Sequence, residues 1–403
     1  MTNTNVGVVA SDDIFPVSPI PIGKLTDAQI EAWTNCATMA GAANPFFEPG
    51  CQIPACHSFL KEKDAQLIVA ERGGNLVACL PLLTHSSHIG PLRRQVAYSR
   101  RFGTPIGLGS PLLVGPQLTD AVNGLLDALK HWSKQGGPGI LMLDWLDDDE
   151  EGVGRTLRDA CAERHIPLRE RRTWERPVVR RSAKGLSLEG NLSTKVRSEL
   201  RRRQRRLEEK LGAPLRLLDR SDTGAVDEFL RLEASGWKGR EGSAFANRPD
   251  AEQWFRGLCD NFASLGKLHM LSLEVDGRSV AMQCFLRSGT SAFSLRVGHD
   301  AELNAFGPGV LLHVAAIEYL DTLDIDLVDS CADPGNPYWA NLYPDRRRMA
   351  NLVLATGSPV DRLAVKSFPI VSQGQRILRH FRKAETRDFE SREWDPPTER
   401  DEA

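Results

Sequence analysis

Leu67-Ile-Val-Ala-Glu-Arg-Gly-Gly-Asn-Leu-Val-Ala-Cys-Leu80 consists of two apolar runs separated by a turn that contains a Gly-Gly pair. Such a pattern predicts a β-hairpin. Met270-Leu-Ser-Leu-Glu-Val-Asp-Gly-Arg-Ser-Val-Ala-Met-Gln283 has the same pattern around Asp-Gly. Glu, Gly, Val and Ala recur 203 positions apart (274 − 71, 277 − 74, 280 − 77 and 281 − 78). Because this offset is about half of the 403-residue chain, it predicts a duplicated domain.

The segments that follow the two hairpins also correspond. A helical pattern over 121–134 leads through Gly136-Gly137-Pro138 to an apolar strand over 140–144. In the second half, a helical pattern from Val310 to about Asp321 leads to a strand over 325–329. Strand–helix–strand order implies parallel pairing with a crossover helix. We therefore expect an α/β fold (a mixed sheet of α+β type) with helices on both faces.

Length and composition agree with two globular units. The chain has 41% hydrophobic and 26% charged residues, which is sufficient for a full core. We divide it into an N-terminal domain (1–180), a C-terminal domain (181–383) and a tail (384–403) with eight acidic residues and three arginines, which we expect to be disordered. The net charge of −2 gives no overall attraction to nucleic acid or to an anionic membrane.

Features of targeting and redox chemistry favour a cytoplasmic protein. Eight cysteines are scattered singly over the chain, unlike those of a disulfide-rich domain. No run of 18 apolar residues predicts a membrane span. Residues 1–13 contain no Lys or Arg and no apolar core of a signal peptide.

A basic helix is predicted between the two halves. Ser193 and Thr194 can begin it, and Gly212 followed by Pro214 ends it. From Ser193 to Leu211 there are eight Lys or Arg and three Glu, a net charge of +5, with a thin apolar stripe. Most of its surface therefore faces solvent or a ligand. It lacks the interleaved aromatic residues of a nucleic-acid-binding surface, so we do not expect nucleic acid as a partner.

The most informative motif is Gly307-Pro308-Gly309, between a strand that ends at Gly298 and a helix that opens at Val310. Proline and glycine at a helix start leave the first amides free and let a ligand approach the backbone. Free amides and the helix dipole suit a phosphate or pyrophosphate. A simple turn between strand and helix is the alternative.

Three segments resemble the GNAT acyltransferase superfamily, in particular its bacterial CelD-type (cellulose-biosynthesis-associated) branch, which is similar to Fem-type peptidyl transferases. They are the basic helix, the Trp-Lys-Gly block of 232–244, and the Gly-Pro-Gly helix start continuing into Asp329-Ser-Cys-Ala and Leu342-Tyr-Pro-Asp-Arg-Arg347. The resemblance covers residues from about 190 to 350, and the first half fits a degenerate copy loosely.

The resemblance implies two tandem GNAT-like units with an acyl-CoA site, for acetyl-CoA above all, in the second. The pantetheine arm would run along the strand 293–298, which contains Arg296 and Val297. The pyrophosphate would lie on the amides near Gly307, Gly309, Val310 and Leu311. The first half lacks a matching Gly-Pro-Gly, so we expect that copy to be structural or to shape the acceptor cleft.

Acyl transfer to an amine requires a group that removes a proton from the ammonium. Glu233 is one candidate, because it lies on the apolar stripe of its helix; a structural hydrogen bond to the loop that follows is the alternative. His299, just after the donor strand, and Asp329, at a strand end, are the other two. Cys331 invites an acyl-cysteine, but we favour a small buried thiol.

The acceptor side is predicted around Trp237 and Lys238, in a glycine-rich segment suited to a mobile loop. Tyr343, like Tyr338, could protonate the departing thiolate, and Arg346 could hold an anionic acceptor or a CoA phosphate. A loop anchor for Trp237 and a solvated charge run for the arginines are the alternatives.

Other sites are not predicted. The Cys and His residues between 51 and 88 have no CxxC and fit no common zinc spacing, so we expect no metal. No GxGxxG, GxxxxGK[ST] or GxSxG motif occurs in a supporting context.

The leading function is an acyl-CoA-dependent N-acyltransferase acting on a small-molecule amine or a sugar-linked acceptor, in polysaccharide or cell-envelope biosynthesis. A Fem-like transferase that uses aminoacyl-tRNA is one alternative, although the segment after Leu211 is too short for a long inserted coiled coil. A non-catalytic accessory protein of exopolysaccharide production is the other. We expect a monomer or a homodimer.

Overall fold

The computed structural model describes residues 14–59, 64–89, 92–99, 107–115, 118–188, 192–221, 223–333 and 337–367. The predicted acidic tail, 384–403, lies outside these ranges.

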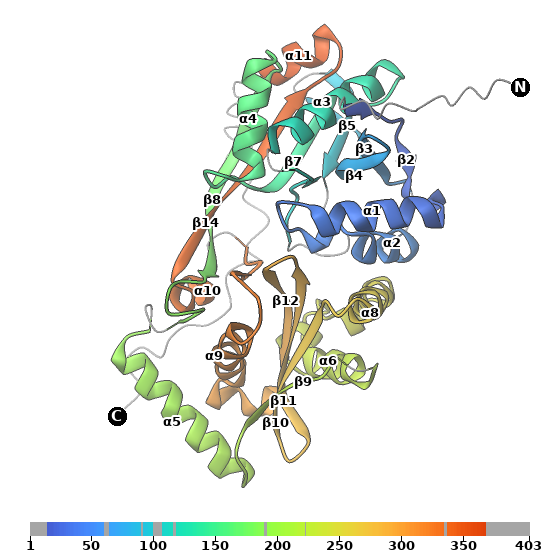
Figure 1. Ribbon diagram of the computed structural model, residues 1–403. Coiled ribbons are helices and arrows are strands. Elements are labelled where there is room, and N and C mark those ends of the chain that lie inside the picture. Colours follow the sequence, from blue (N-terminus) through green and yellow to red (C-terminus); the bar gives the residue numbers. More distant parts are fainter. Residues whose placement is uncertain are drawn as a thin grey trace, which may run out of the picture.

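Helices and strands are interspersed along the whole described chain (Figure 1). The α-helices are α1 (Asp27–Met39), α2 (Pro49–Ser58), α3 (Leu118–Lys134), α4 (Val153–Glu163), α5 (Thr194–Leu211), α6 (Thr223–Ser235), α7 (Trp237–Arg240), α8 (Pro249–Ser264), α9 (Pro308–Asp321), α10 (Pro337–Leu342) and α11 (Pro359–Lys366). The strands are β1 (Ile14–Pro16), β2 (Ile20–Pro21), β3 (Gln66–Arg72), β4 (Asn75–Ile89), β5 (Leu92–Ser99), β6 (Leu112–Leu113), β7 (Ile140–Asp147), β8 (Leu168–Arg180), β9 (Arg216–Asp219), β10 (Leu268–Val275), β11 (Arg278–Ser288), β12 (Ser291–His299), β13 (Leu327–Asp329) and β14 (Asp345–Ala355).

One mixed sheet runs through both halves of the chain. Within the described residues its strand order is β1-β3-β4-β5-β7-β14-β8-β13-β12-β11-β10-β9, with β2 on β3 and β6 on β4. The predicted α/β class with a mixed sheet is therefore confirmed. The division at residue 180 stays a prediction. β14 belongs to the predicted C-terminal domain but lies between β7 and β8, which belong to the predicted N-terminal domain.

The two predicted hairpins are present and share their details. β3–β4 turns at Gly73-Gly74 and β10–β11 at Asp276-Gly277, and all four turn residues have positive φ, as a type I′ turn requires. Each hairpin carries a register shift, between Ala70 and Glu71 in one and between Leu273 and Glu274 in the other. These shifts are again 203 positions apart (274 − 71), so the correspondence extends to an irregularity that hairpin chemistry alone does not require.

The crossover connections are also as predicted. β5 pairs in parallel with β7 across α3, and β12 pairs in parallel with β13 across α9. In the second half, Met282 and Cys284 of β11 pack in one core with α6 and α8, whereas Ala281 and Phe285 pack in another with α9. Helices therefore cover both faces of the sheet (Figure 1).

Direct contacts join the halves. The indole of Trp254, in α8, donates to the carbonyl of Cys51, in α2 (3.3 Å), and Phe46 meets Phe293 of β12 edge to face at 5.9 Å. The start of β12 thus lies next to the first half, at the opposite end of the strand from His299.

Candidate functional site

The second half contains a strand with an open edge. β12 pairs with β13 only from Ser291 to Phe293. Beyond that point the described residues place no strand beside this edge, whereas the other edge stays paired with β11 up to His299. Leu295 is an extra residue in the β11–β12 register, because Ser294 and Arg296 face consecutive residues of β11. A bulge where two strands diverge leaves backbone groups for a ligand.

The helix that follows β12 begins at the predicted Gly-Pro-Gly motif. Gly307 caps α9 in a left-handed conformation (φ 63°, ψ 50°), and Pro308 occupies the first helical position. The amides of Val310 and Leu311 donate to the carbonyl of Gly307 (3.1 and 3.2 Å), so they are engaged within the helix. Gly309 supplies the first-turn amide for which the described residues offer no acceptor.

Two arginines of the basic helix α5 approach this helix start. Nη1 of Arg203 lies 3.0 Å from the position that a Cβ on Gly307 would take. The guanidinium of Arg206 lies 5.7 Å from the ring centroid of Phe306. Glu199 accepts hydrogen bonds from Arg202 and Arg203, which lower the pKa of its carboxyl to about 2. The start of α9 therefore has cations beside it, as an anion requires.

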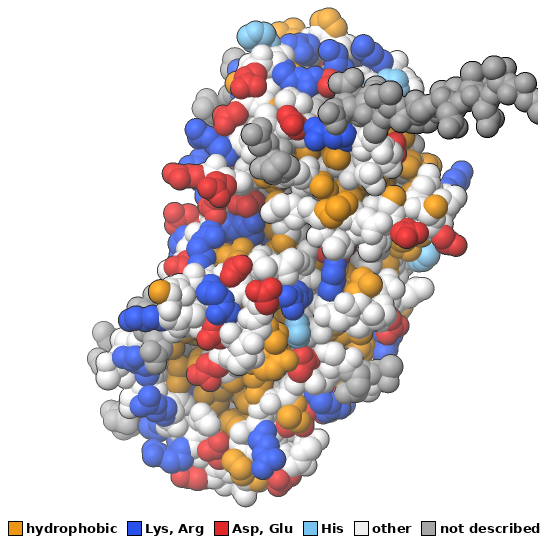
Figure 2. All heavy atoms as spheres, viewed as in Figure 1, with side chains coloured by type: hydrophobic (Ala, Val, Ile, Leu, Met, Phe, Trp, Pro, Cys, Tyr) orange, Lys and Arg blue, Asp and Glu red, His pale blue; other side chains and the backbone are white. Residues whose placement is uncertain are grey.

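The surface view agrees with this placement. Figure 2 shows Lys and Arg side chains along the region of α5, with an apolar area beside them where Figure 1 places α9. Arg203 and Arg206 were not predicted as site residues. Their spacing of three puts them on one helix face, but the sequence does not indicate which element that face meets.

His299 ends β12 at the same place. Its Nε2 lies 2.6 Å from Oδ1 of Asn304, and when Nε2 donates in this contact, Nδ1 of the neutral ring is an acceptor. Nδ1 lies 3.7 Å from the position of a Cβ on Gly309. The structure thus brings together three of the predicted residues, His299, Gly307 and Gly309.

Glu233 is buried, as its helical stripe predicts, and is 2% exposed. One carboxylate oxygen accepts from the amide of Phe245 (2.8 Å) and the other from Nε of Arg296 (2.5 Å). Arg296 also donates to the carbonyl of Ser243 (2.8 Å) and stacks over the ring of Phe245. A Cβ on Gly298 would lie 2.7 Å from the amide of Glu233, so β12 and α6 touch backbone to backbone. These contacts fix the loop after α7 against β12.

Lys238 reaches the strand that has the open edge. Its Nζ donates to the carbonyl of Val297 (3.0 Å). Burial, with the positive charges of Lys238 and His299 adding to it, lowers the pKa of His313 to about 3, so His313 is neutral at pH 7 on the buried face of α9. Trp237 begins α7, and its side chain lies outside the described part of the chain.

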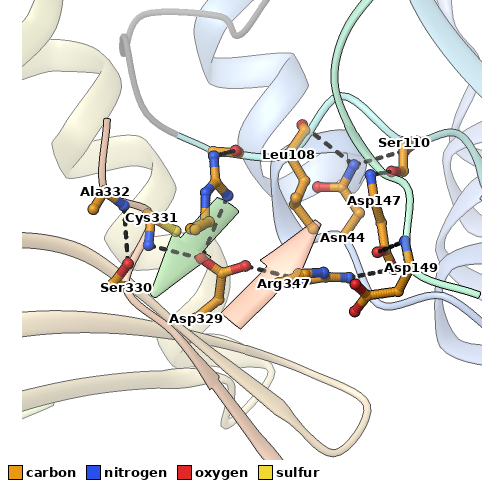
Figure 3. Close-up of polar contacts among 12 residues, drawn as sticks. Asn44, Leu108, Ser110, Asp147, Asp149, Asp329, Ser330, Cys331, Ala332 and Arg347 are labelled. Carbon is orange, nitrogen blue, oxygen red and sulfur yellow. Dashed lines mark hydrogen bonds and ion pairs between the residues drawn. The ribbon is translucent and has the colours of Figure 1, made fainter. Parts of the chain in front are cut away.

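Asp329 lies in a buried ion network at the end of β13 (Figure 3). One carboxylate oxygen accepts from the amide of Cys331 (2.7 Å) and from Arg176 (3.3 Å), and the other accepts from Arg347 (3.0 Å). Arg347 continues to Asp147 of β7 (2.7 Å). Burial opposes ionisation of Asp147, but the charge and hydrogen bond of Arg347 outweigh it and hold its pKa below the usual value.

This network shapes the Asp-Ser-Cys turn. Cys331 has φ of 52°, a left-handed conformation that is uncommon for a residue with a side chain. Burial, and next the charge of Asp329, raises the pKa of the Cys331 thiol well above its usual value. The thiol is therefore protonated at neutral pH, which agrees with a buried thiol rather than a nucleophile.

The remaining predicted residues lie under and beside α10. Tyr343 is fully buried and packs edge to face on Trp339, which packs on His313. Arg346 donates to the carbonyls of Tyr343 and Ala340 (2.8 Å each), at the carboxyl end of α10. Its guanidinium thus stabilises a helix end.

The corresponding gap in the first half is filled by the chain itself. β5 pairs with β7 only as far as Leu143. Beyond it, the amide of Gly109 donates to the carbonyl of Trp145 (3.0 Å), and a Cβ on Gly109 would lie 1.9 Å from the carbonyl oxygen of Asp144. Asn44 holds the segment through the carbonyl of Ser110 (2.7 Å; Figure 3). In the first half, residues of the chain itself thus occupy the position that corresponds to the open edge of β12.

Two further features concern the described part of the chain as a whole. Its helices do not combine the length and the apolar character that crossing a bilayer demands. Its His, Cys, Asp and Glu side chains do not gather in groups of three or more that could hold a metal ion.

Solved structures with a similar fold cover most of the chain. FemX matches with a TM-score of 0.58 at 10% identity, over 84% of this chain and 97% of FemX. A conserved Bacteroides thetaiotaomicron protein of unknown function matches with 0.54 at 13% identity, over 82% and 98%. L-PGS from Bacillus licheniformis matches with 0.50 at 11% identity, over 87% and 98%. At these identities the similarity concerns the fold.

No curated protein matches the sequence. Residues 194–338 match the family model described as an acetyltransferase (GNAT) domain. This segment contains α5, the open edge of β12, the start of α9 and the Asp-Ser-Cys turn. Residues 194–338 are therefore similar in sequence to GNAT acetyltransferase domains.

Proposed function

We propose that the protein is an acyl-CoA-dependent N-acyltransferase of the CelD-type branch that moves an acyl group, acetyl above all, to an amine in polysaccharide or cell-envelope biosynthesis. One observation carries the donor assignment: the open edge of β12 leads directly to the start of α9, where Arg203 and Arg206 lie. An acyl-CoA has its groups in the same order, because amides lie along its pantetheine arm and the diphosphate lies at the far end of that arm.

The proposed donor site has two parts. Backbone groups between Ser294 and Gly298, beside Arg296 and Val297, pair with the amides of the arm. The amide of Gly309 and the guanidinium groups of Arg203 and Arg206 bind the diphosphate, because a helix start beside cations favours phosphate oxygens.

The proposed reaction is direct attack. The neutral amine adds to the thioester carbonyl and forms a C–N bond, the C–S bond then breaks, and the thiolate leaves and takes up a proton. One proton of the amine passes to a base. Both carboxylate oxygens of Glu233 and of Asp329 accept hydrogen bonds within the protein, so we assign these residues to positioning. His299 is the proposed base, through Nδ1.

The acceptor is proposed to enter beside α7, where Trp237 and Lys238 lie. The contact between Lys238 and Val297 brings that segment within reach of the donor strand. Tyr343 and Arg346 are proposed to shape the far side of this region by supporting α10.

A second candidate is aminoacyl transfer from aminoacyl-tRNA. Two observations favour it, the fold similarity to FemX and the cationic surface of α5. RNA would bind such a surface through its phosphates.

Thiol release from acetyl-CoA, measured over a panel of amines that includes amino sugars, tests the first candidate. Amine-dependent release supports it. Transfer that occurs only with aminoacyl-tRNA, assayed in parallel, would favour the second candidate. Binding of acetyl-CoA without turnover on any amine would favour a non-catalytic accessory protein.

A further inference from the structure

A polar pair lies beneath the point where β12 leaves β13. Gln283, on β11, is fully buried and its Nε2 donates to Oγ of Ser294 (2.8 Å). Oε1 of Gln283 has no hydrogen-bond partner among the described residues. Ser294 is 4% exposed and directly follows Phe293, the last residue of β12 that pairs with β13.

The surroundings of this pair are apolar. Side chains alternate along β11, so Gln283 points to the same face as its neighbours Ala281 and Phe285. Those two pack in one core with Leu312 and Ala316 of α9. An amide oxygen that is buried there without a donor destabilises the fold by about 1–3 kcal/mol. A leucine or methionine would fill the position without that cost, so the stability of the fold does not explain why an amide side chain is present.

We propose that Gln283 and Ser294 recognise an N–H group of the acyl donor. An arm that lies along the open edge of β12 passes Ser294, and an N–H close to the acyl group donates to the amide oxygen of Gln283. The ligand class is an acyl donor with a secondary amide or an amino group near the transferred acyl carbon. This inference rests on the proposed function and assigns specificity for the donor to two residues outside the reacting groups.

The chemistry predicts opposite effects on stability and on binding. Replacing both partners of a buried polar pair with apolar groups of similar shape is neutral or stabilising. The variant Gln283→Met/Ser294→Ala removes the oxygen that lacks a partner together with its neighbour. It should therefore unfold at the same temperature as the wild type or higher, and yet bind the donor more weakly.

The test is calorimetric titration with acetyl-CoA and with an analogue whose amide nitrogen nearest the thioester is replaced by oxygen. We expect the double variant to bind acetyl-CoA about tenfold more weakly, the loss of roughly one well-placed hydrogen bond. The wild type should lose about as much with the oxygen analogue, whereas the double variant should discriminate little between the two ligands.

A matched control comes from the same sheet. Ser272 and Ser279 form a buried hydroxyl pair between β10 and β11 (2.9 Å), and Ser272→Ala/Ser279→Ala should leave donor affinity unchanged. Equal affinities of the wild type and of Gln283→Met/Ser294→Ala, or equal losses with the oxygen analogue, would overturn this inference alone. Absence of acetyl-CoA binding by the wild type would overturn the proposed function and this inference with it.

Discussion

His313 should make the second half of the protein sensitive to mild acid. Its pKa is lowered from 6.5 to about 3, by burial first and then by the charges of Lys238 and His299. The unfolded chain therefore binds a proton at this residue below pH 6.5, while the folded chain resists protonation until about pH 3. Stability is present above pH 6.5 and is lost as the pH falls toward 3.

The expected size of the effect follows from the two pKa values. Each unit of pH within this window costs up to about 1.4 kcal/mol. Between pH 7 and pH 5 the loss comes to about 2 kcal/mol, because the unfolded imidazole is only half protonated at pH 6.5. The variant His313→Gln removes the titrating group and should lose this contribution.

The measurement is denaturant unfolding at pH 7, 6 and 5, with hydrogen exchange of the α9 amides as the local readout. The substitution also alters packing against Trp339, but that offset is the same at each pH. Wild type should lose about 2 kcal/mol more than His313→Gln between pH 7 and 5. The exposed His57, changed to Gln, controls for the loss of a histidine. Parallel pH dependences of the wild type and His313→Gln would refute the argument.

Three predictions test other parts of the structure. Arg347→Met leaves the buried Asp329 and the partly buried Asp147 without their shared cation, so we expect a loss of about 3–5 kcal/mol in unfolding free energy. A loss below about 1 kcal/mol would contradict the network. Glu233→Gln should raise the KM for the acceptor by loosening the loop at Phe245 while the pH–rate profile keeps its shape; disappearance of a limb of that profile would return Glu233 to the role of base. Gly109→Ala should lower the unfolding temperature markedly, because its Cβ would lie 1.9 Å from the carbonyl oxygen of Asp144. Gly309→Ala should be tolerated, because its Cβ would lie 3.7 Å from Nδ1 of His299. Equal effects of the two substitutions on the unfolding temperature would contradict the close packing around Gly109 in the first half.

The features that sequence analysis predicted are local ones. Two-residue turns with Gly, a cap followed by helical spacing, and strand–helix–strand order each depend on neighbouring residues, and the hairpins, α5 and both parallel pairs are confirmed. Burial of Glu233 also followed from its helical stripe.

The features that were missed depend on distant partners. Arg176 lies 153 positions from Asp329, and Arg296 lies 63 positions from Glu233. No periodicity indicates such pairings, so two carboxylates that looked like candidate bases proved to be held by arginines. The placement of β14 between β7 and β8 is a long-range pairing of the same kind.

The central claim is that the start of α9 and the open edge of β12 bind an acyl-CoA. Calorimetric titration with acetyl-CoA, with desulfo-CoA and ATP as comparison ligands, tests it most directly. We predict micromolar binding that weakens about tenfold in Arg203→Ala and is lost in Gly309→Leu. Arg205→Ala, an exposed arginine of the same helix, should bind as the wild type does. Absence of binding to any CoA species, or equal affinities of Arg203→Ala and Arg205→Ala, would contradict the claim.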